Sequence, residues 1–330
     1  MNIYCDGIFD LFHMGHLNHF KNIKEYFDND IKLIVGLIND ETSTKYKRKP
    51  IFNEKQREFI LSSCIYVDNV IITDMLQITE EFINDNNIDY VVHAFLNIED
   101  ESKQDNFFKI PKQLNKFIKI DYNNGISTTD IIESGGWNDI WLKKGKIDNN
   151  DLFLLNGWEE TNFNPLKFLT KILDKFNIKE NEKILEMGCG AGLLSQYLSK
   201  YNYIGVDKSM SLVSKHINIL HRIALCYDSC DKIFKENFFD YTICNSMLEY
   251  LDDYEKLDET INELERVTKK GIYIGSIRCK THVIKKSKHL YEGTFKHLVI
   301  QKDYFLERGF TIVDCEHNNE ERYDAYKIYL

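Results

Sequence analysis

The sequence contains very little proline, no long apolar run and no regular cysteine pattern. Only three of its 330 residues are proline, and no stretch approaches the roughly 18 consecutive apolar residues of a membrane-spanning helix. The eight cysteines are scattered without a Cys-x-x-Cys pair, and the spacing of Cys226 and Cys230 is poor for zinc. We therefore expect no membrane span and no metal centre, with the cysteines reduced and mostly buried.

Positive charge is outnumbered by negative charge. The chain has 42 lysine and arginine residues against 52 aspartate and glutamate residues, a net charge of −10. This balance argues against a general nucleic-acid-binding protein, so we expect no nucleic acid among its partners. The first residues enter an apolar segment directly, without the features of a secretory leader, which predicts a cytoplasmic protein. The length of 330 residues suggests about two domains.

Residues 1–133 alternate short apolar strands with amphipathic helices. The expected strands cover residues 3–5, 32–37, 67–72, 89–93 and 117–121. The expected helices cover residues 17–27, 54–64 and 78–84. This alternation predicts an α/β fold with a doubly wound, Rossmann-like parallel sheet. In such sheets ligands bind beyond the carboxyl ends of the strands.

The segment Asp6–His16, with the sequence DGIFDLFHMGH, stands between the first expected strand and the first expected helix. Such a junction offers free backbone N–H groups and the positive end of a helix dipole to an anion. His13 and His16 share one face of the first helical turn, and Gly15 lets a ligand approach the backbone. An isolated His-x-x-His pair would more often cap a helix or lie on the surface. Here the glycine, the strand and Asp10 fit one site, which suits a phosphate under nucleophilic attack.

The segment DGIFDLFHMGH resembles the signature of the cytidylyltransferases that make CDP-alcohols, within the HxGH nucleotidyltransferase superfamily. It is most similar to the choline-phosphate and ethanolamine-phosphate type. A second segment, GISTTDII at residues 125–132, resembles another signature of the same family. The resemblance covers residues 1–133 and implies that CTP, accompanied by Mg²⁺, and a small phosphoalcohol are the substrates. It also implies a homodimer formed through this domain.

The resemblance implies roles for individual residues. His13, His16 and Lys47 would be catalytic, with Lys47 in a mobile loop after the second strand, and Asp6 would bind the alcohol. The residues implied to bind CTP or phosphate are Gly7, Ile8, Phe9, Asp10, Gly15, Arg57, His93, Ser127, Thr128 and Thr129.

Several positions leave alternatives open. Taken alone, the basic run 45–49 is typical of a solvated loop, and His19 is expected on the surface of the second helical turn. Tyr122, Ala94 and Leu76 stand where the family usually has a basic residue, an acidic residue and a tryptophan. These departures leave the identity of the alcohol open, and they keep a nucleotide-binding regulatory domain as an alternative to an enzyme. ATP in place of CTP is a further alternative, since other HxGH proteins use it.

Residues 134–150 are expected to form a linker and a leading helix, and residues 151–330 a second domain. Its expected strands cover residues 183–187, 203–207, 223–227, 239–244 and 271–277, with two final strands at 310–315 and 325–330 forming an antiparallel edge. Its expected helices cover residues 193–199 and 254–268. The same alternation predicts a second doubly wound, Rossmann-like sheet.

The segment Glu186–Gly192, EMGCGAG, joins the first of these strands to a helix. It resembles the E/DxGxGxG loop of class I S-adenosylmethionine-dependent methyltransferases, whose glycines let the cofactor lie close to the backbone. A dinucleotide fingerprint is the alternative for a lone glycine loop. By the resemblance, Asp207 would bind the ribose hydroxyls and Asp228 the adenine amino group. The implied cofactor-binding residues are Glu186, Gly188, Gly190, Gly192, Asp207, Asp228 and Asn245.

Together the two resemblances imply a bifunctional transferase. The first domain would form a CDP-alcohol, and the second would methylate a related small molecule, with Tyr250, Tyr291 and His289 as acceptor contacts. The fusion suggests one pathway, such as methylation of phosphoethanolamine followed by activation with CTP. A sugar hydroxyl of a glycan pathway is the alternative acceptor.

Overall fold

The computed structural model of the chain describes residues 1–121, 150–158, 163–280, 283–285, 294–315 and 321–329. Its contacts divide the chain into two compact units, Met1–Ser127 with Ile233–Lys235, and Thr128–Lys232 with Glu236–Leu330. The predicted domain boundary at residue 133 and nearly all of the predicted linker fall outside the described residues and stay predictions. The same holds for the roles predicted for Tyr122, Ser127, Thr128, Thr129, His289 and Tyr291.

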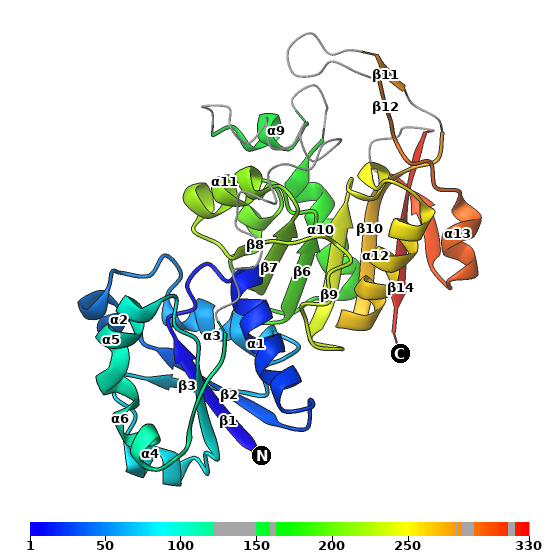
Figure 1. Cartoon of the computed structure of the whole chain (residues 1–330). Helices are drawn as coiled ribbons and strands as arrows, with labels where there is room; N and C mark the ends of the chain where they lie inside the picture. Colours follow the sequence, from blue (N-terminus) through cyan, green and yellow to red (C-terminus); the bar gives the residue numbers. More distant parts are fainter. Residues whose placement is uncertain (122–149, 159–162, 281–282, 286–293, 316–320, 330) are drawn as a thin grey trace. The chain divides into compact units, whose positions relative to one another are not determined.

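The first unit is built on a five-stranded sheet in which every pairing is parallel (Figure 1). Its strands are β1 (Asn2–Gly7), β2 (Lys32–Ile38), β3 (Asn69–Thr73), β4 (Tyr90–His93) and β5 (Phe117–Lys119), in the order β3-β2-β1-β4-β5. The strand order reverses between β1 and β4, and ligands bind beyond the carboxyl ends of strands at such a switch point. The segment Asp6–His16 begins at this point.

The helices of the first unit follow the strands. They are α1 (Met14–Tyr26), α2 (Asp40–Tyr46), α3 (Glu54–Ser63), α4 (Glu80–Asp85), α5 (Ile98–Gln104), the 3-10 turn η1 (Asp105–Phe108) and α6 (Lys109–Gln113). Helix α1 buries Leu17, Phe20 and Ile23, at the helical spacing that the sequence predicted. A separate hydrophobic cluster surrounds Tyr4 of β1 and Val91 of β4.

Residues 40–46 form helix α2, so the prediction of a mobile loop there is wrong. The Asn39 side chain caps the helix by accepting a hydrogen bond from the Thr42 N–H at 2.8 Å. Asp40 and Glu41 lie in the first turn, where their charges favour the helix dipole. Lys47 follows the last turn as its C-cap and is exposed.

The second unit contains a seven-stranded sheet with the order β13-β14-β10-β9-β6-β7-β8. The strands are β6 (Lys183–Met187), β7 (Asn202–Asp207), β8 (Ala224–Cys226), β9 (Phe239–Asn245), β10 (Thr268–Arg278), β13 (Thr311–Asp314) and β14 (Arg322–Ile328). The five strands from β10 to β8 are parallel, whereas β14 runs antiparallel to both β10 and β13. The predicted antiparallel edge is confirmed. Two further strands, β11 (Val283–Lys285) and β12 (Thr294–Lys296), pair with each other.

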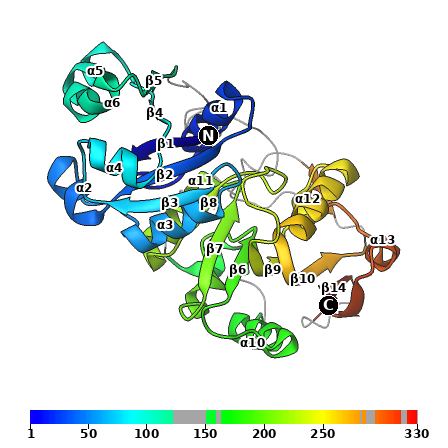
Figure 2. The ribbon, with the colours of Figure 1, turned by 90° about the horizontal axis from the view of Figure 1, so that it is seen from below.

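The helices of the second unit are α9 (Leu152–Leu155), α10 (Pro165–Phe176), α11 (Met210–Leu220), α12 (Tyr254–Val267) and α13 (Lys302–Glu307), with 3-10 turns η2 (Ser195–Tyr197) and η3 (Leu248–Tyr250). Figure 2 shows α10 and α12 on opposite faces of the sheet, as expected for a doubly wound fold. The helix predicted over residues 193–199 is only the short turn η2, so that prediction is wrong. The Ser195 hydroxyl donates to the Gly192 carbonyl at 3.2 Å, and such local bonds compete with a regular helix.

Within the described ranges, no helix is both long and apolar enough to cross a membrane. Six of the eight cysteines are buried, as predicted, and none of the eight forms a disulfide.

Candidate functional site

The turn between β1 and α1 is tightly wound. Phe9 and Leu11 both adopt left-handed backbone conformations, with φ of 49° and 50°, which is uncommon for large side chains. The Phe9 ring packs against the rings of His16 and Phe20, with centroids 5.4 Å and 5.1 Å apart. A Cβ on Gly7 would lie 3.0 Å from the Phe9 ring. Gly7 and Phe9 therefore fix the shape of the turn that presents the two histidines.

The histidines cap the helix that carries them. His13 is the N-cap of α1, and its Nδ1 accepts a hydrogen bond from the Gly15 N–H at 3.1 Å. The His13 N–H in turn donates to His16 Nδ1 at 3.4 Å, and the two rings stack 4.0 Å apart. Since each Nδ1 is an acceptor, each neutral ring carries its proton on Nε2. The turn therefore offers two Nε2–H donors at the positive end of a helix dipole.

The surroundings of both imidazoles favour their neutral forms. Burial lowers the pKa of His13. Burial lowers the pKa of His16 well below its usual range, and the neighbouring His13 and His19 lower it further. A Cβ on Gly15 would lie 2.9 Å from His13 Cε1, so this position suits a glycine.

His19 belongs to the same group of imidazoles, although the sequence placed it on the surface. Burial lowers its pKa to about 4. Burial, with a smaller contribution from His19, also lowers the pKa of His93 to about 4. The His93 ring lies 4.6 Å from each of Phe95 and Phe108. The signal for His19 in the sequence was the continued i+3 step from His13 and His16.

Asp6 is a carboxyl group with raised pKa at the end of β1. Burial raises its pKa to about 7, against a smaller lowering by a backbone hydrogen bond. No cationic side chain in the described ranges contributes to that pKa. Strands β1 and β4 pair in parallel from Ile3 and Tyr90 onward, which brings Asp6 and His93 to the same edge of the sheet.

Asp10 anchors the segment that follows α2. Its two carboxylate oxygens accept from the N–H groups of Ile51 and Phe52 at 2.9 Å and 3.0 Å. Arg48 adds an ion pair to the same carboxylate at 3.2 Å. These contacts tie the segment carrying Lys47 to the turn carrying the histidines.

Arg57 is fully buried, and its guanidinium contacts the wall of the site. It donates to the main-chain oxygens of Phe52, Ile8 and Ile38 at 3.0, 2.6 and 2.9 Å. It also pairs with Asp40 at 2.7 Å. Through its bond to the Ile8 carbonyl, Arg57 therefore fixes the backbone of the turn between β1 and α1.

In the second unit, the loop after β6 has the backbone that its glycines allow. Gly188, Gly190 and Gly192 all have positive φ, at 77°, 51° and 95°. A Cβ on Gly188 would lie 2.5 Å from the Met247 side chain, and one on Gly190 would lie 2.1 Å from Asn156 Oδ1. The glycines were predicted to let a cofactor lie close to this loop. In this structure, the side chains of Met247 and Asn156 lie close to it.

Asp207 and Glu186 lie beside the glycine loop in different roles. Asp207 accepts from the N–H groups of Gly190 and Ser209, both at 2.8 Å, and burial raises its pKa. Glu186 accepts from the Tyr203 hydroxyl at 2.6 Å, and burial raises its pKa to about 8. Asp207 therefore contacts the glycine loop directly, whereas the Glu186 carboxyl is buried against Tyr203 of the neighbouring strand β7.

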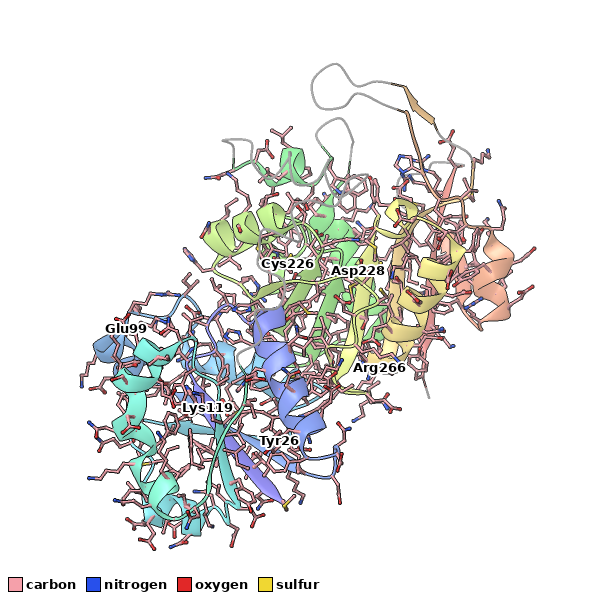
Figure 3. The ribbon with its side chains drawn as sticks, viewed as in Figure 1. Tyr26, Glu99, Lys119, Cys226, Asp228 and Arg266 are labelled. Atoms are coloured by element: carbon pink, nitrogen blue, oxygen red, sulfur yellow. The ribbon has the colours of Figure 1, made fainter. Side chains whose placement is uncertain are left out.

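Asp228 follows β8, whose last residue is Cys226; both residues are labelled in Figure 3. Lys208 pairs with Asp228 at 2.8 Å, and the Cys230 thiol donates to it at 3.3 Å. Burial opposes ionisation of Asp228, but the hydrogen bond and charge of Lys208 outweigh burial and lower its pKa. Asn245 is the last residue of β9. A Cβ on Gly275 would lie 2.5 Å from the Asn245 Oδ1.

Two groups in this unit have no signal in the local sequence. Asn156 follows α9 and accepts from the Ala191 N–H of the glycine loop at 3.1 Å. Glu249 is 2% exposed and binds Arg278, Arg322 and His297 at 2.6, 2.8 and 3.2 Å. Both groups join residues distant in sequence, so no local pattern could have shown them.

Three or more His, Cys, Asp or Glu side chains suited to one metal ion do not occur together anywhere in the described ranges.

Comparison with known families decides what the two sheets are. Residues 4–134 match the family model described as cytidylyltransferase-like. Residues 185–274 match the model described as a methyltransferase domain. The chain joins a cytidylyltransferase-like domain to a methyltransferase domain. The two resemblances inferred from the glycine and histidine motifs are confirmed at this level.

Curated relatives match the cytidylyltransferase-like domain. Choline-phosphate cytidylyltransferase of Saccharomyces cerevisiae is 37% identical over 132 residues, which are 40% of this chain and 31% of that protein. Choline-phosphate cytidylyltransferase 2 of Arabidopsis thaliana is 40% identical over 133 residues, 40% of this chain and 43% of that protein. The ethanolamine-phosphate cytidylyltransferase of Dictyostelium discoideum is 32% identical over 133 residues, with 40% and 36% covered. The match thus spans less than half the length of each relative.

Solved methyltransferase structures are more distant. A phosphoethanolamine N-methyltransferase of Haemonchus contortus, solved with phosphoethanolamine and S-adenosylhomocysteine, has a TM-score of 0.46 and 13% identity, covering 61% of this chain and 49% of that one. An S-adenosylmethionine-dependent methyltransferase of Clostridium acetobutylicum has a TM-score of 0.39 and 16% identity, covering 48% and 88%. Likeness of this degree does not bear on the methyl acceptor.

Proposed function

We propose that the cytidylyltransferase-like domain transfers a cytidylyl group from CTP to a small phosphoalcohol. A phosphate oxygen of the alcohol forms a bond to the α-phosphorus of CTP, and pyrophosphate leaves with the broken bond. The observation that carries this proposal is the pair of histidines that cap α1 through Nδ1 and keep Nε2–H for a ligand. The family match of residues 4–134 supports the same chemistry.

Catalysis here is positioning and charge stabilisation, without a covalent enzyme intermediate. His13 and His16 would donate hydrogen bonds to phosphate oxygens, where negative charge develops as pyrophosphate leaves. Lys47 would add a positive charge, and Mg²⁺ would accompany CTP. We keep Gly7, Ile8, Phe9, Gly15, His93 and the Ser127–Thr129 segment as the proposed CTP-binding set. Asp10 and Arg57 would serve this set by fixing the backbone around it.

The alcohol is proposed to carry an amine. Asp6 is a half-buried carboxyl whose pKa is raised to about 7, and no cationic side chain in the described ranges contributes to that pKa. An ammonium group beside it would stabilise the ionised form, because an opposite charge favours ionisation. Phosphoethanolamine and its N-methylated forms have such a group, whereas glycerol 3-phosphate does not. The curated relatives named for choline phosphate and ethanolamine phosphate agree with this choice.

The methyltransferase domain is proposed to use S-adenosylmethionine, whose sulfonium supplies an electrophilic methyl group when bound. The residues fit this group, since three left-handed glycines remove side chains from the loop and Asp207 ends β7 beside it. Asp207 would bind the ribose hydroxyls, Asp228 the adenine amino group and Asn245 the methionyl end, with Gly188, Gly190 and Gly192 as the loop. Glu186 would support the loop from below. The proposed acceptor is the amine of the same phosphoalcohol series.

The test is pyrophosphate release by the full chain with CTP and Mg²⁺. The substrate panel contains phosphoethanolamine, its mono-, di- and trimethyl forms and glycerol 3-phosphate, with ATP replacing CTP in a parallel series. We expect release with CTP and an amine-bearing substrate, and its loss in His16→Ala. Turnover with glycerol 3-phosphate alone would overturn the amine assignment. Nucleotide binding without turnover across the panel would overturn the transferase and favour a regulatory domain.

A further inference from the structure

The glycine loop of the methyltransferase domain has no main-chain donor to spare. Three N–H groups donate to main-chain oxygens, those of Gly188 and Cys189 to Val206 at 2.8 and 3.0 Å and that of Gly192 to Cys189 at 3.0 Å. The two others donate to side chains. Gly190 donates to Asp207 Oδ2 at 2.8 Å, and Ala191 donates to Asn156 Oδ1 at 3.1 Å. An anionic ligand that binds a main-chain N–H of this loop must therefore displace one of two side-chain acceptors, Asp207 or Asn156.

Asn156 is held over the loop by helix α9. The helix begins at Asp151, whose side chain accepts from the N–H groups of Phe153 and Leu154. Leu155 is fully buried in a cluster with Ala191 and Leu212 of α11, and Figure 1 shows α9 beside α11. The Asn156 Nδ2 donates to the Leu152 carbonyl at 2.7 Å, which turns Oδ1 toward Ala191. Asn156 Oδ1 can occupy this place because residue 190 is a glycine. A Cβ at that position would lie 2.1 Å from Oδ1.

The two side-chain acceptors respond differently to a cofactor. The Asp207 carboxylate has two oxygens with about four lone-pair sites, so it can accept from ribose hydroxyls and still accept from Gly190. The Asn156 amide oxygen is a neutral acceptor that competes for one N–H. A carboxylate is a stronger acceptor for an N–H than an amide oxygen is. Asn156 is therefore the acceptor that yields.

We infer that Asn156 gates the amino-acid end of the cofactor: its amide oxygen holds the Ala191 N–H until the methionyl carboxylate takes that bond and displaces α9. This inference rests on the proposed use of S-adenosylmethionine. It makes α9, which lies outside the βα units, part of the cofactor site. Asn156 is accordingly a positioning residue, whose effect depends on whether the ligand has a carboxylate.

Two ligands separate this role from a general structural one. S-adenosylhomocysteine has the carboxylate, and 5′-methylthioadenosine keeps the nucleoside and the thioether but lacks the amino-acid group. Calorimetric titration of the full chain gives the dissociation constant of each. In Asn156→Ala, we expect S-adenosylhomocysteine to bind about fivefold more tightly, the worth of one competing hydrogen bond. Binding of 5′-methylthioadenosine should not change.

Asn156→Asp provides a test of opposite sign. A carboxylate is a stronger acceptor than an amide oxygen and would compete better for the Ala191 N–H, so we expect S-adenosylhomocysteine to bind at least about fivefold more weakly, with 5′-methylthioadenosine again unchanged. The matched control is Asn150→Ala in the same segment, where the exposed Asn150 side chain accepts, among the residues that the structure describes, only from Lys215 at 3.4 Å. It should alter neither ligand.

The outcomes are distinct. Weaker binding of both ligands in Asn156→Ala would make Asn156 a structural residue and overturn the inference. Weaker binding of S-adenosylhomocysteine alone in that variant would make it a direct cofactor contact, which also overturns the gate. Failure of the wild-type chain to bind either ligand would overturn the proposed cofactor itself.

Trp158 offers an independent readout of α9. Its main-chain N–H donates to the Phe153 carbonyl of α9 at 2.8 Å. Its ring stacks on that of Phe163, with the ring centroids 4.2 Å apart. The chain has three tryptophans, so Trp137→Phe with Trp141→Phe leaves Trp158 as the single reporter. We expect its fluorescence to change with S-adenosylhomocysteine and not with 5′-methylthioadenosine. An equal response to both ligands, or to neither, contradicts a displacement driven by the carboxylate.

Discussion

At the scale of the residue, the two ring nitrogens of each motif histidine have separate tasks. Nδ1 completes the helix start, and Nε2–H is the donor that we propose binds a phosphate oxygen. A substitution can therefore keep one nitrogen's task and remove the other. Asparagine reproduces an N-cap acceptor but has no atom at the position of Nε2.

His13→Asn should keep the fold and lose the chemistry. Since asparagine is a preferred N-cap, we expect the melting temperature to stay close to that of the wild type. We expect kcat for pyrophosphate release to fall about 100-fold or more, the usual loss when one preorganised donor is removed. Thermal unfolding and a pyrophosphate assay on the same preparation check both halves. Retained turnover would show that the His13 Nε2–H does not act on the phosphates.

Asp6 predicts a pH-dependent stability. Its pKa is raised from 3.8 to about 7 in the folded protein, so between these values the folded state holds a proton that the unfolded state has released. Stability then falls as pH rises through this window, and the full penalty is present above it. Asp6→Asn cannot ionise, so its melting temperature relative to the wild type should be higher at pH 8 than at pH 5. A difference that does not change with pH would mean that the Asp6 carboxyl is solvated.

At the scale of the element, the segment after α2 is held at its start by the helix, through the Ser43 carbonyl, and farther along by Asp10. Asp10 accepts two main-chain N–H groups and pairs with Arg48. The segment carries Lys47, so the proposed phosphate contact depends on an anchor 37 positions earlier in the chain. A cation elsewhere on α2 should matter far less.

Asp10→Ala should raise the KM for CTP about tenfold, because Lys47 would no longer be held near the motif turn and charge-assisted bonds of this kind contribute about 1.5–3 kcal/mol each. Lys45→Ala is the matched control, since Lys45 is exposed and, within the described part of the chain, pairs only with the exposed Glu41 on its own helix. Steady-state kinetics with varied CTP measures both variants. Equal changes in the KM for CTP in Asp10→Ala and Lys45→Ala would contradict a specific role of Asp10 and indicate a general effect of charge.

Elements with strong local signals could be predicted from the sequence, and those that depend on distant partners could not. The strands of both sheets and the strand-to-helix position of the histidines followed from apolar spacing and motif context. Helix α2 differs from the predicted loop because the Asn39 cap favours a helix, whereas the basic run 45–49 is typical of a loop. Arg57 was expected among the phosphates, whereas its guanidinium lies against Ile8, Ile38 and Phe52.

The cofactor side shows the same limit. The glycine loop and Asp207 were visible as a pattern, but the Asn156 side chain reaches the loop from 35 positions before Ala191. Glu249 meets Arg278 and Arg322 from 29 and 73 positions away. Such contacts depend on packing, which the order of residues does not display.

At the scale of the whole molecule, each sheet supplies its own candidate site. The histidine turn lies at the end of β1, and the glycine loop lies at the end of β6. We expect His13→Asn to leave S-adenosylhomocysteine affinity within about twofold of the wild type, as for independent sites. Gly190→Ala, strained at φ of 51° and facing Asn156 Oδ1, should abolish that binding and leave pyrophosphate release intact.

Titration and turnover on both variants check this independence. Loss of both activities in either variant would mean that the two reactions share a site or a conformational state. The proposed homodimer is measured on the same samples by light scattering, and a monomeric mass at assay concentration would remove it.

The place of β14 in the second sheet has a consequence for synthesis on the ribosome. All five strands of the first sheet come from the first 119 residues, so that sheet can assemble as soon as this part has emerged. In the second sheet, β14 pairs with β10 and β13, and its Arg322 completes the buried ion cluster on Glu249. Until residue 322 has emerged, β10 has an unpaired edge and Glu249 lacks one of its cations. The nascent chain therefore passes through a stage at which one domain is folded and the other exposes a strand edge, the state in which chaperones and aggregation compete.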